Sequence, residues 1–416
     1  MFMELQNIIT EKMVFGGNCL GKINGKNVFV PFALPGEKLE IRITEQKNDY
    51  DNAEIVNIVK ESENRVKPEC KYYGICGGCN MMHIKPEAQT EYRRQMLFEM
   101  LKNNGIDFPL EKIQAVTGPD KGYRSRFQLT DGGLSEKRKN IIIPIDQCLC
   151  AEKPINKYLS ETEVKFRPSG RIHFFGSEKA VTLEGKQLNT PVIEKPQEKT
   201  VQKIIQSKKS SKKYKFKENK YFAGTAASPE NEVTVQLSDK KLTFDVRGFF
   251  QSNMFVFEKT CCLIRDLLIP GDNILDMYSG CGSLSVFASD KAGKVTLVEH
   301  NRDALVFAER NMAGTNHISY GMSGENWVKN CSVTCPHFDA IVIDPPRSGM
   351  ERPVLDYLIK SKALQIISMS CDPATHARDL AKLLRNGYEI KNVYLLDFYP
   401  NTSHIESLVE LRKKSD

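Results

Sequence analysis

The sequence lacks any long apolar run, since no stretch approaches the roughly 18 residues that a membrane-spanning helix needs. Its first residues, "MFMELQNIITEKMVFGG", carry charges early and show no basic start followed by an apolar segment, unlike a secretory signal. No segment repeats elsewhere in the 416 residues. We therefore expect a cytoplasmic protein of two or three domains that does not enter a membrane.

A regular disulfide pattern is also missing. The chain has twelve cysteines, but their spacing is uneven and the chain is long. This distribution argues against a disulfide-stapled scaffold and favours metal or thiol chemistry in a reducing compartment.

The basic surplus of the chain is confined to one stretch. The net charge is +7, and residues 201–220, "VQKIIQSKKSSKKYKFKENK", carry eight lysines and one glutamate. Such a lysine-rich run is most often a solvated loop. With Tyr214 and Phe216 among the lysines, it also suits an arm that contacts phosphates without sequence preference. A loop can be both.

Three regions follow one another along the chain. In residues 1–62, "GKNVFVPFALPGEKLEIRI" places a Pro-Gly turn between two strand-like runs and predicts a small β-barrel. Residues 63–238 are mixed α+β and include a helical stretch, "PEAQTEYRRQMLFEMLKNNG". In residues 239–416, buried-strand runs alternate with helical stretches, which predicts a doubly wound parallel sheet. The expected fold class is α/β plus β.

The segment "NILDMYSGCGSLSVFAS" (273–289) has the features of a nucleotide-binding turn. A strand run ends at Asp276, and Gly280 and Gly282 bracket a tight turn before a helix. The third glycine of the dinucleotide fingerprint is missing. Glu299 ends the next strand run, where its carboxylate can accept hydrogen bonds from ribose hydroxyls. The pattern favours S-adenosylmethionine over NAD; the alternative is a plain α/β turn with an exposed glutamate.

A third strand end lies in "FDAIVIDPPRSGM" (338–350), with Asp344 facing the same crevice. The motif resembles the Asp/Asn-Pro-Pro-aromatic tetrad of amino-group methyltransferases, in which the aromatic ring stacks on a flipped base. Arg347 occupies the aromatic position here, so an amino-nitrogen target loses its stacking platform.

In "SMSCDPATHARD" (368–379), Pro373 predicts that a strand ends, turns a corner at Cys371 and leads into a helix ending near Gly387. A helix N-terminus beside the thiol would help to lower its pKa. A thiolate there could add to carbon 6 of a uracil and make carbon 5 nucleophilic enough to accept a methyl group. The alternative is a small buried core cysteine.

A base is then needed to remove the proton from carbon 5. In "LLDFYPNTSHIESLVEL" (395–411), His404 and Glu406 alternate with Ile405 on a predicted strand, so both side chains would share one face. Glutamate suits this step if desolvation raises its pKa. The alternative is that both are ordinary solvent-facing residues.

Together these motifs and "FFQSNMF" (249–255) come in the order found in bacterial RNA uracil-5 methyltransferases, which the sequence resembles over its whole length, including an N-terminal barrel of the TRAM type. The resemblance implies that Cys371 is the nucleophile and Glu406 the base. It implies a donor-binding set of Gln251, Tyr278, Ser283, Glu299, Asn326 and Asp344. Asparagine is common in the family at the position of Ser283. Asp372 also replaces a usual asparagine, and its carboxylate would oppose thiolate formation unless it is turned away.

The cysteine cluster "CKYYGICGGC" places Cys70, Cys76 and Cys79 at metal-ligand spacing, with Cys148 or Cys150 as the fourth ligand. Spacing alone serves a four-iron four-sulfur cluster and a tetrahedral zinc ion equally well. The resemblance favours the [4Fe-4S] cluster with Cys148, because the ribosomal-RNA members of the family carry one with this spacing. Its expected role is to hold the central domain and its RNA surface.

The expected partner is RNA. The barrel region 1–60 holds seven Lys/Arg and eight Asp/Glu, so its RNA-binding role is implied by the resemblance and not by charge. In "YRSRF", Tyr123, Arg124 and Arg126 resemble an RNA-contacting stretch of the family; the alternative is that they are strand-surface residues.

We expect a monomeric enzyme that methylates carbon 5 of a uridine in 23S rRNA. Three alternatives stay open: a transfer-RNA substrate, a base-amino methyltransferase, and a non-catalytic RNA-binding assembly factor. The cysteine cluster argues against transfer RNA, because the tRNA-directed relatives lack one.

Overall fold

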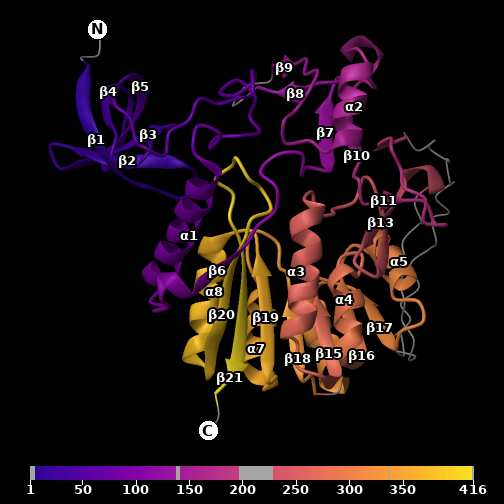
Figure 1. Ribbon diagram of the computed structural model, residues 1–416. Coiled ribbons are helices and arrows are strands. Elements are labelled where there is room, and N and C mark those ends of the chain that lie inside the picture. The colour runs from indigo at the N-terminus through magenta and orange to yellow at the C-terminus, as the bar shows by residue number, and fades with distance from the viewer. Residues whose placement is uncertain (1–4, 137–140, 196–227, 336, 415–416) are drawn as a thin grey trace, which may run out of the picture.

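The computed structural model describes residues 5–136, 141–195, 228–335 and 337–414 (Figure 1). The lysine-rich stretch 201–220, with Tyr214 and Phe216, lies outside the described residues. None of the helices in the described ranges has both the length and the apolar character that a membrane span requires.

The N-terminal region is a closed five-stranded barrel, as predicted, with strand order β1-β2-β3-β5-β4. Along β4, apolar side chains alternate with polar ones and point into the barrel, as the two-residue period of a strand dictates. Gly36 has φ +80° in the turn before β4, a conformation that glycine adopts without a steric penalty. The strands are β1 (Gln6–Met13), β2 (Asn18–Ile23), β3 (Lys26–Pro31), β4 (Lys38–Gln46) and β5 (Tyr50–Lys60).

In its described residues, the central region combines two α-helices with short strands. Helix α1 (Pro86–Asn103) begins with a proline in its first turn and ends just before Gly105 at φ +75°, as predicted. Two three-stranded sheets, β12-β10-β7 and β11-β13-β14, and the pair β8-β9 complete it. The other elements are β6 (Ile113–Val116), β7 (Arg126–Thr130), β8 (Leu134–Ser135), β9 (Ile142–Ile143), α2 (Lys153–Glu161), β10 (Arg171–Phe175), β11 (Ala180–Val181), β12 (Val192–Ile193), β13 (Glu232–Leu237) and β14 (Lys240–Asp245).

The C-terminal region is built on an eight-stranded sheet of order β17-β16-β15-β18-β19-β21-β20-β6. Its strands are β15 (Gly271–Met277), β16 (Ala292–Glu299), β17 (His317–Gly321), β18 (Ala340–Ile343), β19 (Gln365–Ser370), β20 (Tyr388–Leu396) and β21 (Glu406–Lys413). Its helices are α3 (Met254–Leu267), α4 (Ser283–Ala288), α5 (Arg302–Asn311), α6 (Gly324–Asn330), α7 (Arg352–Ser361) and α8 (Pro373–Arg385).

Helices cover both faces of this sheet, which confirms the doubly wound arrangement. One buried cluster joins α1, α7 and α8 to one face, and a second joins α3, α4 and α5 to the other. Strands β18 and β19 are buried along their whole length, which explains why their sequences read as unbroken apolar runs.

The prediction of a parallel sheet is wrong for one strand. Strands β15 to β19 are parallel, but β21 runs antiparallel to both β19 and β20. Residues 397–405 join β20 to β21 without a crossover helix, and a connection without a crossover returns the chain antiparallel.

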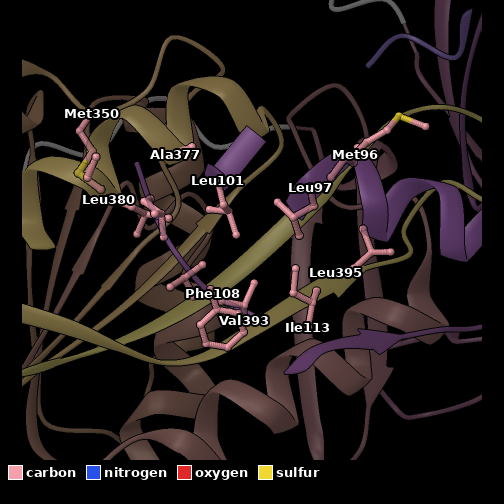
Figure 2. Close-up of a cluster of buried hydrophobic side chains, with 14 of the residues drawn as sticks. Met96, Leu97, Leu101, Phe108, Ile113, Met350, Ala377, Leu380, Val393 and Leu395 are labelled. Carbon is pink, nitrogen blue, oxygen red and sulfur yellow. The ribbon is translucent and has the colours of Figure 1, made fainter. Parts of the chain in front are cut away.

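The central region also contributes to this sheet. Strand β6 adds in parallel to the edge at β20, and Leu97 and Leu101 of α1 pack toward Ile113, Val393 and Leu395 (Figure 2). Four residues, "IQAV", are too few to show a hydrophobic period, so the sequence alone does not place β6 there. The expected boundaries at 62/63 and 238/239 stay predictions, and the β13–β14 hairpin crosses the second of them.

Candidate active site

The carboxyl ends of β15, β16 and β18 form the crevice in which sheets of this type bind ligands. The chain leaves β15 through Tyr278 at φ +67° and Gly282 at φ +76°, and then enters α4. A Cβ atom at Gly282 would lie 3.2 Å from Cα of Ala308, so a larger residue would be both strained and crowded. The glycine turn expected from the sequence is therefore present.

Four of the six predicted donor-binding residues line one small cavity of about 60 Å³ in this crevice: Gln251, Tyr278, Ser283 and Asp344. Three buried oxygen atoms in its wall have no hydrogen-bond partner within the described residues: Gln251 Oε1, Asp276 Oδ1 and Ser279 Oγ. Buried polar atoms are nearly always paired in proteins, so the cavity presents polar groups that suit a polar ligand. From the sequence, Asp276 is recognisable only as a strand end, by a carboxylate that ends an apolar strand, and Ser279 carries no such signal.

Glu299 is buried and fixed at the end of β16. Its Oε2 accepts a hydrogen bond from the Gly280 amide at 2.9 Å, and its Oε1 accepts one from the Asn301 amide at 2.6 Å. Nδ1 of His300 also lies 3.1 Å from Oε1. A carboxylate has about four acceptor sites, so it keeps capacity for a further hydrogen bond. The structure thus places Glu299 against the glycine turn, as a ribose-binding residue requires.

Asn326 lies elsewhere. It is exposed on α6, and its backbone N–H donates to the Ser323 hydroxyl that caps this helix. The side chain does not line the cavity beside Gln251 and Asp344. Its assignment to the donor site stays a prediction.

Cys371 and Glu406 lie next to each other at the ends of paired strands. The antiparallel register pairs Ser370 of β19 with Ser407 of β21, and the next residues outward are Cys371 and Glu406. Cys371 is half-buried at the corner between β19 and α8, where the sequence predicted it. Glu406 is buried, and its Oε2 has no hydrogen-bond partner among the described residues.

His404 does not share a strand face with Glu406, so that prediction is wrong. Strand β21 begins at Glu406, and His404 lies in the preceding loop with its imidazole exposed, 5.6 Å from the ring of Tyr399. The alternation of polar and apolar residues extends beyond the hydrogen-bonded strand, which begins at Glu406. Glu406 is therefore the residue of this pair with the buried environment that a general base needs.

Burial raises the pKa values of the acidic groups of the site, and neighbouring carboxyls add to the rise for Cys371 and Glu406. Burial raises the pKa of the Cys371 thiol, the carboxyls of Glu406 and Asp344 raise it further, and Arg347 partly opposes them. Burial, assisted by Asp344, raises the pKa of Glu406 well above its usual value, again against Arg347. Desolvation raises the pKa of Asp344 to about 7. Burial and the two carboxyls thus raise the pKa of the thiol, whereas the sequence indicates a helix N-terminus that would help to lower it.

Asp372 is turned into the helix and away from this cluster. Its Oδ1 accepts a hydrogen bond from the Thr375 amide at 2.8 Å, which caps the N-terminus of α8. The groups that raise the thiol pKa by their charge are Glu406 and Asp344, and Asp372 is not among them. An aspartate at this position therefore preserves the helix cap and has little effect on the pKa of the Cys371 thiol.

The loop that leads into Glu406 is held by the central region (Figure 1). The Asn401 side chain donates to the Asp120 carbonyl at 2.7 Å, and its backbone amide donates to Oε1 of Gln89 at 2.7 Å. The Tyr123 hydroxyl donates to the Pro400 carbonyl at 2.8 Å. Tyr123 is thus a buried anchor, contrary to its expected place on a surface.

A buried ion pair adds to this support. Nη2 of Arg93 in α1 lies 2.8 Å from Oδ2 of Asp397, the first residue of the loop, and both side chains are almost fully buried. Breaking such a pair leaves an uncompensated charge and is strongly destabilising. The loop before Glu406 is therefore fixed by α1 and by the segment that contains Tyr123.

A larger cavity lies in the central region. It holds about 440 Å³ and is lined by five cysteines: Cys70, Cys76, Cys79, Cys148 and Cys150. The sulfur atoms of Cys79 and Cys150 are 3.7 Å apart. Across residues 5–136, 141–195, 228–335 and 337–414, no three metal-binding side chains converge on one point as ligands of a single ion. Arg124 also lines this cavity, whereas Arg126 donates to the Gly248 carbonyl at 2.8 Å.

Comparison with known proteins decides the family. The profile described as tRNA (uracil-5-)-methyltransferase matches residues 134–414, and a TRAM domain profile matches residues 6–56. The chain belongs to the RNA (uracil-5-)-methyltransferase family. It is an S-adenosylmethionine-dependent enzyme that methylates carbon 5 of uracil in RNA, and its barrel is a TRAM domain. The base-amino and non-catalytic alternatives lose their support.

Relatives of this methyltransferase match over nearly its whole length. An uncharacterized RNA methyltransferase of Treponema denticola is 33% identical over 99% of this chain and 100% of its own. The 23S rRNA (uracil(1939)-C(5))-methyltransferase RlmD of Haemophilus parainfluenzae is 30% identical over 97% of this chain and 96% of its own. The fold is similar to that of the Pyrococcus abyssi tRNA (uracil-54, C5)-methyltransferase in complex with S-adenosyl-L-homocysteine, at TM-score 0.67 and 21% identity, covering 98% and 100% of the two chains.

Stability should depend on pH through the buried Asp276. Burial raises its pKa to about 7, against a hydrogen bond from Ser285, with Asp344 and Glu299 adding to the rise. Between the ordinary value near ~3.9 and about 7, the folded protein holds a proton that the unfolded chain releases, so the free energy of unfolding falls as pH rises through this window.

We therefore expect Asp276→Asn to be more stable than the wild type at pH 8, with a free energy of unfolding higher by on the order of 1–4 kcal/mol. Near pH 4 we expect no gain. Urea unfolding of both proteins across this range measures the difference. The exposed Asp356→Asn on α7 is the control and should show no pH-dependent gain. An equal effect of Asp276→Asn at both pH values would contradict the assignment.

Proposed function

We propose that this enzyme methylates carbon 5 of a uridine in 23S ribosomal RNA, with Cys371 as nucleophile and Glu406 as base. The observation that carries the proposal is the register of β19 and β21, which puts the thiol and the buried carboxyl side by side at the edge of the donor crevice. A methyltransferase that needed no covalent step would have no use for a thiol beside a buried carboxyl whose Oε2 has no hydrogen-bond partner among the described residues.

The reaction follows from these two groups. The Cys371 thiol gives its proton to solvent water and its sulfur bonds to carbon 6 of the flipped uracil, which moves an electron pair toward carbon 5. Carbon 5 takes the methyl group from S-adenosylmethionine, whose sulfonium–methyl bond breaks so that S-adenosylhomocysteine leaves. Glu406, as carboxylate, then removes the proton from carbon 5, the bond between sulfur and carbon 6 breaks, and the thiolate is released. Its raised pKa makes Glu406 a stronger base than an exposed glutamate once it has ionised.

The donor is assigned to the cavity whose wall contains the partnerless oxygens. Glu299 would accept hydrogen bonds from the ribose hydroxyls of the donor. Asp344 would lie between the donor and the base, since its charge acts on both Cys371 and Glu406. The remaining predicted contacts are Gln251, Tyr278, Ser283 and Asn326. Arg347, whose charge acts on the thiol and on Glu406, would stabilise the anionic form of either group.

Two observations favour ribosomal RNA. Matches to the 23S rRNA enzyme RlmD extend over almost the whole chain, and five cysteines surround one cavity of the central region. The test is methylation of purified 23S rRNA and of bulk tRNA, both from cells that lack the gene, by the purified enzyme. We expect 5-methyluridine in one segment of the 23S rRNA and none in tRNA. Methylation of tRNA alone would contradict this substrate. We expect one chain to suffice for activity.

We propose in addition that Cys70, Cys76, Cys79 and Cys148 hold a [4Fe-4S] cluster. The cavity of about 440 Å³ exceeds the ~30 Å³ share of one water many times over, so it has room for a polyatomic cluster. Such a cluster would fix the segment that anchors the loop before Glu406 and would take no part in methyl transfer. Protein purified without oxygen should contain about four irons and four sulfides per chain. One zinc ion per chain and no sulfide would contradict the cluster.

A further inference from the structure

His376 is a buried imidazole that the reaction described above does not use. It lies in α8, five residues after Cys371, on the side of the helix that faces the sheet. Its Nδ1 is 2.8 Å from the Ser407 hydroxyl of β21, and its Nε2 is 3.0 Å from the Ser368 hydroxyl of β19. All three side chains are at most 3% exposed. Helix α8 is therefore tied by hydrogen bonds to two neighbouring strands at once.

The imidazole is neutral in this environment. Burial lowers the pKa of His376 to about 4, against Asp379 and Asp372, which act in the opposite direction. A neutral imidazole donates at one nitrogen and accepts at the other, and a serine hydroxyl can do either. Both ring nitrogens are thus paired without a buried charge.

The two serines are close to the two reacting groups. Ser407 follows Glu406 directly, and Ser368 lies three residues before Cys371 on the strand that pairs with β21. Successive strand residues point to opposite faces, so Ser407 faces α8 while Glu406 points away from it. Whatever holds the Ser407 side chain therefore fixes the strand end from which the Glu406 carboxyl projects.

We propose that His376 is a positioning residue that sets the Glu406 carboxyl against the reacting uracil by binding Ser407, with Ser368 as its anchor on the nucleophile strand. An apolar helix–sheet contact would supply cohesion but no fixed direction, whereas two hydrogen bonds from one rigid ring define both distance and orientation. The bond to Ser407 is the one that acts on the base. The inference depends on the proposed roles of Cys371 and Glu406.

The proposal predicts which step fails. Addition of Cys371 to carbon 6 should survive loss of the imidazole, because Cys371 stays at its corner before the capped α8. Removal of the carbon-5 proton should slow by about ten- to a hundredfold, since a shift of about 1 Å has effects of this size. A variant that is merely less stable would lose both steps in parallel.

The experiment uses RNA carrying tritium at carbon 5 of its uridines, S-adenosylmethionine and the full chain. Tritium release reports proton removal, and the fraction of protein that stays bound to RNA in denaturing gels reports the adduct. We expect His376→Leu to release tritium slowly and to accumulate adduct on ordinary RNA, and Ser407→Ala to behave in the same way. In His376→Asn the side-chain amide stands near the place of Nδ1, so release should recover to within about threefold.

Two results would overturn the proposal: tritium release by Ser407→Ala at the wild-type rate, or equal losses of adduct formation and release in both variants. Ser407→Ala removes one oxygen atom and decides the question even if His376→Leu fails to fold. Wild-type enzyme and Cys371→Ala are run in parallel on 5-fluorouridine RNA. If the wild type forms an adduct there and Cys371→Ala does not, the proposed function holds whatever the result for His376.

Discussion

Cys371→Ala is expected to abolish methylation of RNA, with a loss of at least about 10⁴-fold in the rate of 5-methyluridine formation. Carbon 5 of uracil is too weak a nucleophile without prior addition at carbon 6, and removal of an enzyme's covalent nucleophile has effects of this order. The assay is transfer of the labelled methyl group from S-adenosylmethionine to RNA. Thermal unfolding should change little, because the half-buried thiol contributes little apolar area.

The matched control lies one position further along. Asp372→Asn keeps the cap of α8, since asparagine and aspartate are about equally good at this position, and the Asp372 carboxylate is not among the groups that shift the thiol pKa. We expect its activity to stay within about threefold of the wild type. Retention of activity by Cys371→Ala would contradict covalent catalysis.

Glu406→Gln is expected to slow turnover by about 10²–10⁴-fold, the range typical of a lost general base, while leaving addition of the thiol intact. The amide has nearly the same size but cannot take the proton from carbon 5. The methylated adduct should therefore persist, and the protein should migrate with its RNA in denaturing gels even when the RNA carries ordinary uridine. The wild type should show no such species at the end of the reaction.

Glu410→Gln is the control for this variant. Glu410 is buried on the same strand but accepts hydrogen bonds from Gln365, Asn392 and Arg412, at a distance from Cys371 along the strand. Its replacement should lower stability and leave no trapped adduct. Normal turnover by Glu406→Gln would move the role of the base to another group, of which Asp344 is the nearest candidate in charge and position.

The sequence predicts the order of the elements well where a single period dominates. The runs that become β15, β16, β18 and β19 are apolar because both faces are covered, and the glycine turn at 280–282 and the corner at Cys371 follow from backbone restrictions of glycine and proline. The antiparallel direction of β21 depends instead on a connection that contains no helix. The amino-acid composition of β21 does not show this direction.

The electrostatics of the site were harder to predict. A helix N-terminus beside Cys371 indicates a lowered thiol pKa, but burial of the thiol raises it. Glu406, which is 35 residues away in sequence and adjacent through the sheet register, raises it further. The His376–Ser407 bond depends on the same register, since helix and strand meet only in the folded chain. Local motifs therefore predict which residues react, while contacts between distant segments determine their protonation and orientation.

The most direct test is to incubate the pure enzyme with S-adenosylmethionine and RNA whose uridines are replaced by 5-fluorouridine, then digest and weigh the peptides. Fluorine at carbon 5 leaves no proton for Glu406 to remove. The reaction should therefore stop at the covalent adduct, with a stable bond between the Cys371 sulfur and carbon 6. A methylated fluorouridine attached to the peptide that contains Cys371 is the result we predict. Recovery of that peptide unmodified, with enzyme that is active on ordinary RNA, would contradict the account.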